Sequence, residues 1–121
     1  MKIKIFFHDN EILGELQNTK TAKTIYDSLP LDGAAIRWEE EVYFAIPVRI
    51  SPEKDATEEV REGDIAYWPQ GQSFCVFFGK EPNSTGNKTR AASKVNVFGK
   101  IEDISLFHNI KDGDLIIVER A

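Results

Sequence analysis

The residues best suited to covalent chemistry are one cysteine, Cys75, and two histidines, His8 and His108. A cysteine becomes a nucleophile when a neighbouring base helps to form its thiolate. The local sequence places neither histidine beside Cys75, so a buried and unreactive thiol is expected. The same residues are too few and too widely separated to hold a metal ion. We therefore predict no catalytic residue, no metal and no cofactor.

Aromatic residues offer a different chemistry, because they can line a site for a small molecule or an extended peptide. They are also the main core formers of small barrels, so core packing is the alternative for each one, Tyr67 included. Among the polar residues, Arg37, Arg49 and Glu40 are expected to orient an anionic or amide ligand, with surface ion pairs as the alternative. The predicted groove residues are Trp38, Glu40, Tyr43, Phe44, Arg49, Trp68 and Phe77.

The elements that would position these residues are organised around a hairpin within residues 63–80. Residues 65–68 and 73–78 are rich in β-branched and aromatic residues, which predicts two strands. Pro69 presets its own φ angle and Gly71 can adopt a left-handed conformation, so a tight turn is expected between the strands.

The second of these strands is apolar on both faces. Alternation places Phe74, Val76 and Phe78 on one face, and Cys75 and Phe77 on the other. A strand of this kind must be covered on both sides. We expect the protein core to cover one face and interpret the other as available for a groove.

The rest of the chain predicts a small β protein. Strands are expected at residues 2–7, 11–16, 34–38, 41–46, 95–101 and 115–119. A short helix should follow the capping residues 18–21 and end at Pro30, and residues 103–107 can form a helical turn. Residues 51–64 are acidic and predict a solvated loop, and residues 81–94 predict a polar connection. About eight short strands with one or two short helices favour a mainly β fold closed into a barrel.

Composition limits the class of protein. With 121 residues, the chain is expected to form a single domain over residues 1–121. A hydrophobic share of 41% and a charged share of 29% are near the globular average, and the net charge of −5 disfavours nucleic-acid binding. We find no apolar run long enough to span a membrane and no signal-peptide pattern, and the single cysteine fits a reducing compartment. A cytoplasmic protein without a membrane partner is expected.

Several motifs resemble those of the cyclophilin fold. Cyclophilins carry a strand of the type S-Q-F-F-I-C and later H-V-V-F-G-K-V, which are similar to residues 72–77 and 95–101 here. Their early helix, with P-K-T-A-E-N-F, is similar to residues 21–26. The resemblance is closer to a family of small bacterial and archaeal cyclophilin-like proteins without an assigned activity. The motifs shared with that family are Glu41-Val42-Tyr43-Phe44 with Pro47-Val48, residues 63–71 with Phe77-Phe78-Gly79, and residues 95–101. The resemblance covers most of the chain and implies a cyclophilin-like barrel.

The resemblance does not extend to the residues with which cyclophilins isomerise prolyl bonds. Their arginine lies in an F-H-R-I-I-P motif, whereas Phe44-Ala45-Ile46-Pro47 has no arginine and Arg49 is in a different register. The cyclophilin groove phenylalanine aligns with Cys75, and the histidine with Val95. Isomerisation needs a cationic donor that weakens amide resonance, because the barrier is roughly 20 kcal/mol. Isomerase activity should therefore be weak or absent.

The sequence leaves three hypotheses for function. The first is a non-enzymatic cyclophilin-like barrel that binds a small molecule or an extended peptide in an aromatic groove. The second is a weak or divergent peptidyl-prolyl cis-trans isomerase in which Arg49 replaces the missing arginine. The third is an interaction or assembly module that uses an exposed strand edge or the acidic segment 51–64. The sequence does not select an oligomeric state.

Overall fold

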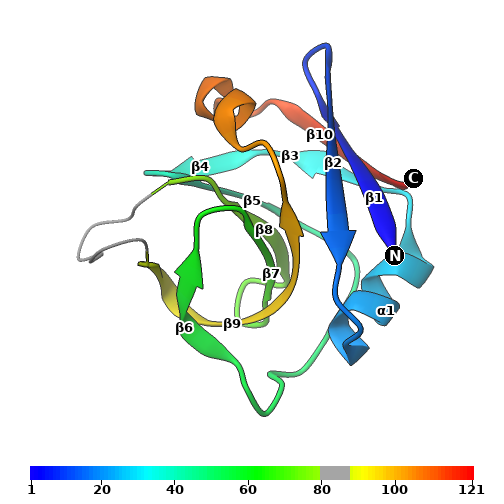
Figure 1. The fold of residues 1–121 in the computed structure, drawn as a ribbon, viewed down its shortest axis with the longest axis vertical. Helices are drawn as coiled ribbons and strands as arrows, with labels where there is room; N and C mark the ends of the chain where they lie inside the picture. Colours follow the sequence, from blue (N-terminus) through cyan, green and yellow to red (C-terminus); the bar gives the residue numbers. More distant parts are fainter. Residues whose placement is uncertain (80–87) are drawn as a thin grey trace.

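The structure, a computed structural model, describes residues 1–79 and 91–121 in full and the backbone of residues 88–90. Within these residues the chain forms ten strands, one α-helix and one 3₁₀ helix (Figure 1). In chain order the elements are β1 (Lys2–Phe7), β2 (Asn10–Leu16), α1 (Lys20–Ser28), β3 (Leu31–Ala34), β4 (Ile36–Trp38), β5 (Glu41–Ala45), β6 (Thr57–Arg61), β7 (Asp64–Trp68), β8 (Ser73–Phe77), β9 (Lys88–Ile101), η1 (Ser105–Asn109) and β10 (Leu115–Arg120). The predicted mainly β class is confirmed.

Hydrogen bonds do not close the sheet, so the predicted closed barrel is not confirmed. The strand order is β3-β10-β1-β2-β9-β7-β8-β5-β4, with β6 paired to β9 outside this path. Among the described residues, the two outer strands β3 and β4 are not paired with each other. They are consecutive in the chain and are joined by Ala35, whose N–H donates to the Asp114 carbonyl (2.7 Å) and whose carbonyl accepts from the Gly113 N–H (2.8 Å). The backbone of Ala35, between β3 and β4, is thus hydrogen-bonded to the turn before β10 and not to another strand.

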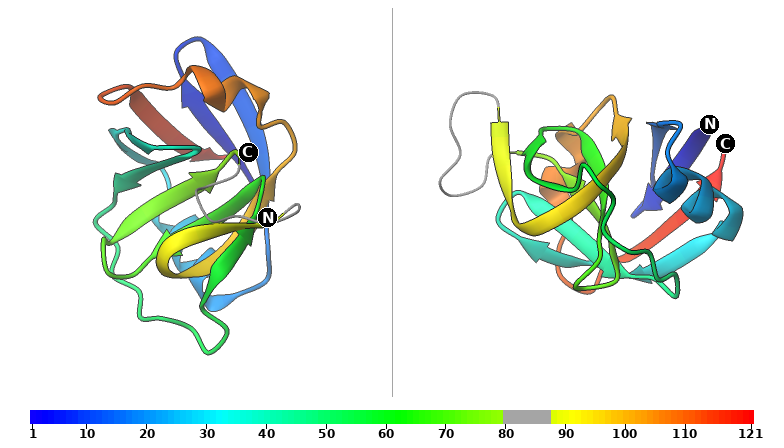
Figure 2. Two further views of the ribbon diagram at one scale, coloured as in Figure 1. Left: turned by 90° about the vertical axis from the view of Figure 1, so that its left-hand side faces the viewer. Right: turned by 90° about the horizontal axis from the view of Figure 1, so that it is seen from below.

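Two predicted loops contain more strand than expected. Residues 57–61, inside the predicted acidic loop, form β6, because they pair with the start of β9. Strand β9 begins at Lys88, seven residues before the predicted start at Val95. It curves from β6 at one end to β7 and β2 at the other, as Figures 1 and 2 show. The part of the predicted connection at residues 81–87 lies outside the described residues.

Helix α1 confirms the predicted short, one-sided helix. The Thr19 hydroxyl caps its first turn by accepting a hydrogen bond from the Ala22 N–H (3.0 Å). Thr21, Ala22 and Ile25 are buried, and Ala22 and Ile25 pack into the main hydrophobic core. The helix therefore contributes one apolar face to the core beside the sheet.

The turn of the central hairpin forms as predicted, but the conformational reason differs. Strands β7 and β8 pair antiparallel across the turn, and the left-handed residue is Gln72 (φ 48°) instead of Gly71. Gly71 is needed for space, because a Cβ there would lie 2.2 Å from the Trp68 indole ring. The turn is therefore shaped around the tryptophan that precedes it.

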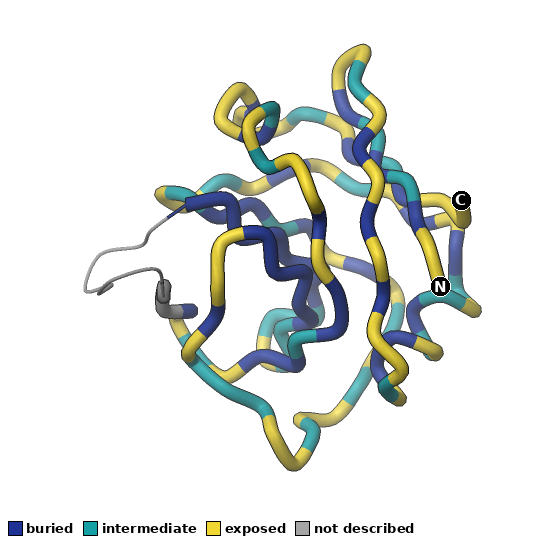
Figure 3. Tube along the Cα trace, viewed as in Figure 1, coloured by how far each residue is buried: buried dark blue, intermediate teal, exposed yellow. Residues whose placement is uncertain are grey.

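The two faces of β8 lie in separate hydrophobic clusters, as alternation predicted. Phe74, Val76 and Phe78 belong to the large core between the sheet and α1. The opposite face contributes to a smaller cluster beneath the curved start of β9, formed by Val60, Ala66, Cys75, Phe77, Ala91 and Val95. All residues of β8 and all residues of β7 except Trp68 are buried, and Figure 3 shows a largely buried stretch at the centre of the fold.

Candidate ligand-binding pocket

A cavity of about 200 Å³ opens beside the smaller cluster, between β4, β5, β7 and β9. We call this cavity the aromatic pocket. Its lining consists of Trp38, Glu41, Tyr43, Trp68, Ala91, Ala92, Ser93 and Val95. The cavity has about the volume of six or seven water molecules, below the usual range for drug-sized ligands. It suits a small ligand.

Strand register brings the pocket residues together. Trp38 lies opposite Glu41 across β4 and β5, and Glu41 lies opposite Phe77 across β5 and β8. In the next row on the same face, Tyr43 lies opposite Cys75. Alternate residues of a strand share a face, so Glu41 and Tyr43 both point toward the smaller cluster. A motif that is contiguous in sequence therefore supplies both a carboxyl group and an aromatic ring to one site.

Two aromatic walls of the pocket meet nearly at right angles. The ring centroids of Tyr43 and Trp68 are 5.5 Å apart, with an angle of 82° between the ring planes. The indole N–H of Trp68 donates to the Ser93 hydroxyl of β9 (2.5 Å), which fixes the ring against the opposite strand. Gly71 leaves room for the same ring. These contacts hold the wall in place before any ligand binds.

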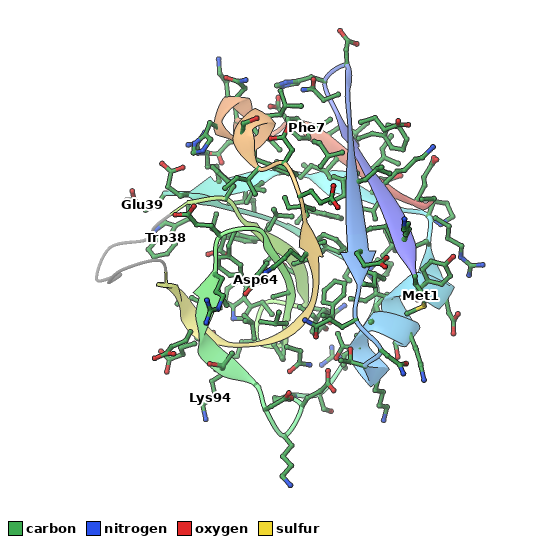
Figure 4. The ribbon with its side chains drawn as sticks, viewed as in Figure 1. Met1, Phe7, Trp38, Glu39, Asp64 and Lys94 are labelled. Atoms are coloured by element: carbon green, nitrogen blue, oxygen red, sulfur yellow. The ribbon has the colours of Figure 1, made fainter. Side chains whose placement is uncertain are left out.

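The remaining walls come from an exposed tryptophan and from small residues of β9. Trp38 is 43% exposed at the end of β4, and Figure 4 shows it on the side of the molecule where β9 begins. Ala91, Ala92 and Ser93 line the other side. Larger side chains at these positions would occupy the cavity, so the run of small residues keeps it open.

Glu41 is the buried charged group of the pocket. Its side chain is 7% exposed, and burial raises the pKa of the carboxyl group to about 7. A hydrogen-bonding interaction with the Cys75 thiol, which also lies 3.8 Å from the Ser73 carbonyl oxygen, partly opposes the effect. Glu41 therefore changes charge near neutral pH, where it can gain or lose a proton in response to what binds beside it.

The neighbouring ionisable groups stay neutral near pH 7. Burial, followed by the negative charge of Glu41, raises the pKa of the Cys75 thiol well above its ordinary value. The same two causes raise the pKa of the Tyr43 phenol. The predicted burial of Cys75 is confirmed. Its raised pKa opposes formation of a nucleophilic thiolate.

The other predicted groove residues lie outside the aromatic pocket or beneath it. Phe77 is fully buried in the smaller cluster, opposite Glu41 in the register of β5 and β8. Phe44 lies in the large core, where its ring stacks on Phe74 with centroids 5.2 Å apart. Arg49 lines a separate surface cavity with Lys20, next to α1. The structure thus brings Trp38, Tyr43 and Trp68 together and does not bring Arg49 to them.

Glu40 and Arg37 form an ion-pair cluster on another side of β5. The Glu40 carboxylate lies 3.7 Å from Arg37 and 3.1 Å from the His108 ring. Arg37 also donates to the carbonyls of Glu39, His108 and Ile110, and its guanidinium lies 5.0 Å from the Phe78 ring centroid. These contacts agree with the surface-ion-pair alternative for both residues.

Neither Glu41 nor the β9 residues were predicted for the site from the sequence. Glu41 stands in a run of three glutamates that resembles a solvated turn, and only the alternation with Tyr43 indicates its direction. Ala91 and Ser93 lie in a stretch whose polar composition predicted a loop. Cross-strand pairing with β6, which a single sequence does not reveal, turns that stretch into a wall of the pocket.

Neither a metal-binding cluster nor a membrane-spanning helix occurs in the described part of the chain. No group of histidine, cysteine and acidic residues there is arranged to hold a metal ion. No helix there combines the length and apolarity needed to cross a membrane.

Comparison with known proteins identifies the family. The sequence profile of the cyclophilin-like family matches residues 1–119. The chain belongs to the cyclophilin-like family. A solved relative, the solution structure of a hypothetical protein from Archaeoglobus fulgidus, is 38% identical to this cyclophilin-like chain, with a TM-score of 0.81. The alignment covers 100% of this chain and 95% of the relative. None of the curated proteins compared with the chain matches it.

Proposed function

We propose that this cyclophilin-like chain binds a small molecule in the aromatic pocket and does not catalyse prolyl isomerisation. The observation that carries the proposal is the cavity itself, with two rings held at 82° above a buried carboxyl group. Aromatic walls and a few fixed polar groups are the usual features of small-molecule sites. The small volume favours a compact ligand over an extended peptide.

The presence of a buried carboxyl group in the pocket also supports binding. Desolvation of Glu41 makes its ionised form costly, and an apolar residue of similar size would avoid that cost. Buried groups with strongly shifted pKa values gather at functional sites, although structural networks shift them too. At this position the shifted group faces a cavity, which favours a role in binding.

A fragment screen by NMR tests the proposal. Ligands of the pocket should shift the indole N–H signal of Trp68 and the backbone amides of Tyr43 and Ser93. A Trp38→Ala variant should weaken those shifts without unfolding, because Trp38 is 43% exposed and lies outside the hydrophobic core clusters. The matched control is Ile36→Ala, an exposed apolar residue two positions earlier on β4 that does not line the pocket. Fragments whose shifts gather at no common surface would overturn the proposal.

The isomerase hypothesis assigns the missing cationic role to Arg49, and the position of Arg49 beside Lys20 argues against it. In an exchange assay on a proline peptide, the native protein and Arg49→Ala should both give the uncatalysed rate. Catalysis by the native protein that falls at least about tenfold in Arg49→Ala would contradict the proposal, since one positioned donor contributes that much or more.

A further inference from the structure

We propose that the aromatic pocket binds a small organic cation, whose ammonium group lies against the aromatic rings and faces the Glu41 carboxylate. This inference rests on the proposed function, because it names the ligand class of the same pocket. It differs from the sequence expectation of an anionic ligand held by arginine.

The aromatic walls suit a cation. The faces of tryptophan and tyrosine rings carry negative potential and attract ammonium groups within about 6 Å of the ring centroid. Tyr43 and Trp68 present two such rings at nearly a right angle, and Trp38 adds a third from β4. The Trp68 N–H is already bonded to Ser93, so the indole offers a ligand its π surface rather than a hydrogen-bond donor.

The buried carboxyl group supplies the complementary charge. Glu41 lies directly across from Trp38 in the register of β4 and β5, and both residues line the cavity. Burying a carboxylate is costly unless an opposite charge or several hydrogen bonds compensate for it. Among the described residues, the hydrogen-bond partner found for this carboxyl group is the Cys75 thiol, which is a weak donor. A bound ammonium ion would provide the missing compensation.

Other ligand classes fit the pocket less well. An anion would lie against both the ring faces and the Glu41 carboxylate, and each would repel it. A neutral apolar molecule would fill the cavity without compensating the carboxylate charge. The net charge of −5 acts in the same direction, since it favours the approach of cations over anions.

Binding of a cation should be coupled to release of a proton from Glu41. Among the described residues, the titratable side chains found to interact with Glu41 are Cys75 from β8 and Tyr43 from β5, and both have raised pKa values. The described lining residues of β4, β7 and β9 are not titratable near pH 7. The pH dependence of binding between pH 6 and pH 8 should therefore follow Glu41.

A matched pair of probes tests the inference. Isothermal titration and NMR should be used with choline and with 3,3-dimethylbutan-1-ol, its neutral isostere. We expect choline to bind about tenfold more tightly than the alcohol at pH 8, as a cation–π cage with a carboxylate would provide. We also expect its affinity to rise about tenfold from pH 6 to pH 8, as a group with a pKa near 7 becomes ionised.

Three variants separate the charge of the pocket from its shape. Glu41→Gln should reduce the preference for choline and abolish its pH dependence, whereas Glu39→Gln should keep both. Glu39 carries the same charge on the exposed β4–β5 turn, at the edge of the molecule in Figure 4, and does not line the pocket. Trp38→Leu should weaken choline binding at least about threefold by removing one ring.

The outcomes also distinguish this inference from the proposed function. Equal or tighter binding of the neutral alcohol would overturn the inference and leave small-molecule binding intact. Failure of both probes to bind would overturn the inference too. The proposed function would fall with it only if the fragment screen also found no ligand at the pocket.

Discussion

Two buried polar side chains, Asn96 on β9 and Glu41 on β5, show opposite uses of burial. Asn96 is 2% exposed and fully engaged. Its carbonyl oxygen accepts from the Glu53 N–H (2.8 Å), and its amide group donates to the Thr21 hydroxyl (3.1 Å) and to the Ser51 carbonyl (3.1 Å). These bonds attach the segment before β6 to helix α1, so the burial of Asn96 serves the fold.

Glu41 is almost as deeply buried but is less well compensated. A weakly donating thiol is the hydrogen-bond partner found for its carboxyl group in the described part of the chain, and its pKa rises to about 7. Its side chain also lines a cavity. The comparison teaches that the hydrogen bonds a buried polar group makes, more than its burial, separate a structural group from a candidate binding group.

The largest expected effect on stability comes from removing the hydrogen bonds of Asn96. Asn96→Leu should lower the free energy of unfolding by about 4 kcal/mol, because the buried Thr21 hydroxyl and two part-buried backbone groups, the Glu53 N–H and the Ser51 carbonyl, lose their hydrogen bonds. Urea denaturation measures this loss. Lys94→Leu, an exposed position on the same strand, should change stability by less than about 0.5 kcal/mol. A loss below about 1 kcal/mol in Asn96→Leu would remove the contrast with Glu41.

Neutralising Glu41 should raise the free energy of unfolding instead of lowering it, and the gain should depend on pH. Its pKa is raised from 4.5 to about 7 on folding, so the folded state binds the proton more tightly and stability falls as pH rises from about 4.5 to 7. Glu41→Gln lacks this loss. At pH 8 it should be more stable than the native protein by up to about 3 kcal/mol, with little difference at pH 4.

Denaturation of both proteins at the two pH values checks this prediction. Glu39→Gln is the matched control, and it should show no such pH-dependent gain because Glu39 is exposed. Destabilisation of Glu41→Gln at both pH values would mean that the carboxylate is a structural group like Asn96.

A smaller loss of stability should follow from adding a side chain beside the Trp68 ring. In Gly71→Ala the new Cβ would lie 2.2 Å from the indole, which must move and lose its bond to Ser93. We expect a loss of about 2 kcal/mol in stability, typical of overpacking, together with a shifted indole N–H signal. Gln70→Ala, an exposed change in the same turn, should do neither. An unshifted indole signal in Gly71→Ala would show that the wall is not held as described.

The strand faces that carry the site were predicted from the sequence better than its buried carboxyl group, Glu41. Alternation along β8 correctly assigned Phe74 and Cys75 to opposite clusters, because period-two patterns directly encode the faces of a strand. The curved start of β9 was not predicted, since its residues become a wall only by pairing with β6. Glu41 was missed for a related reason, because burial of a glutamate depends on strands that lie far away in sequence.

The central claim is that Glu41 is a poorly compensated carboxyl group in a pocket for a cation. The most direct test is a pH titration of its side-chain carboxyl carbon by ¹³C NMR, with and without choline. The pKa should lie near 7 in the free protein and should fall when choline binds. A value near 4.5 that choline leaves unchanged would contradict the account.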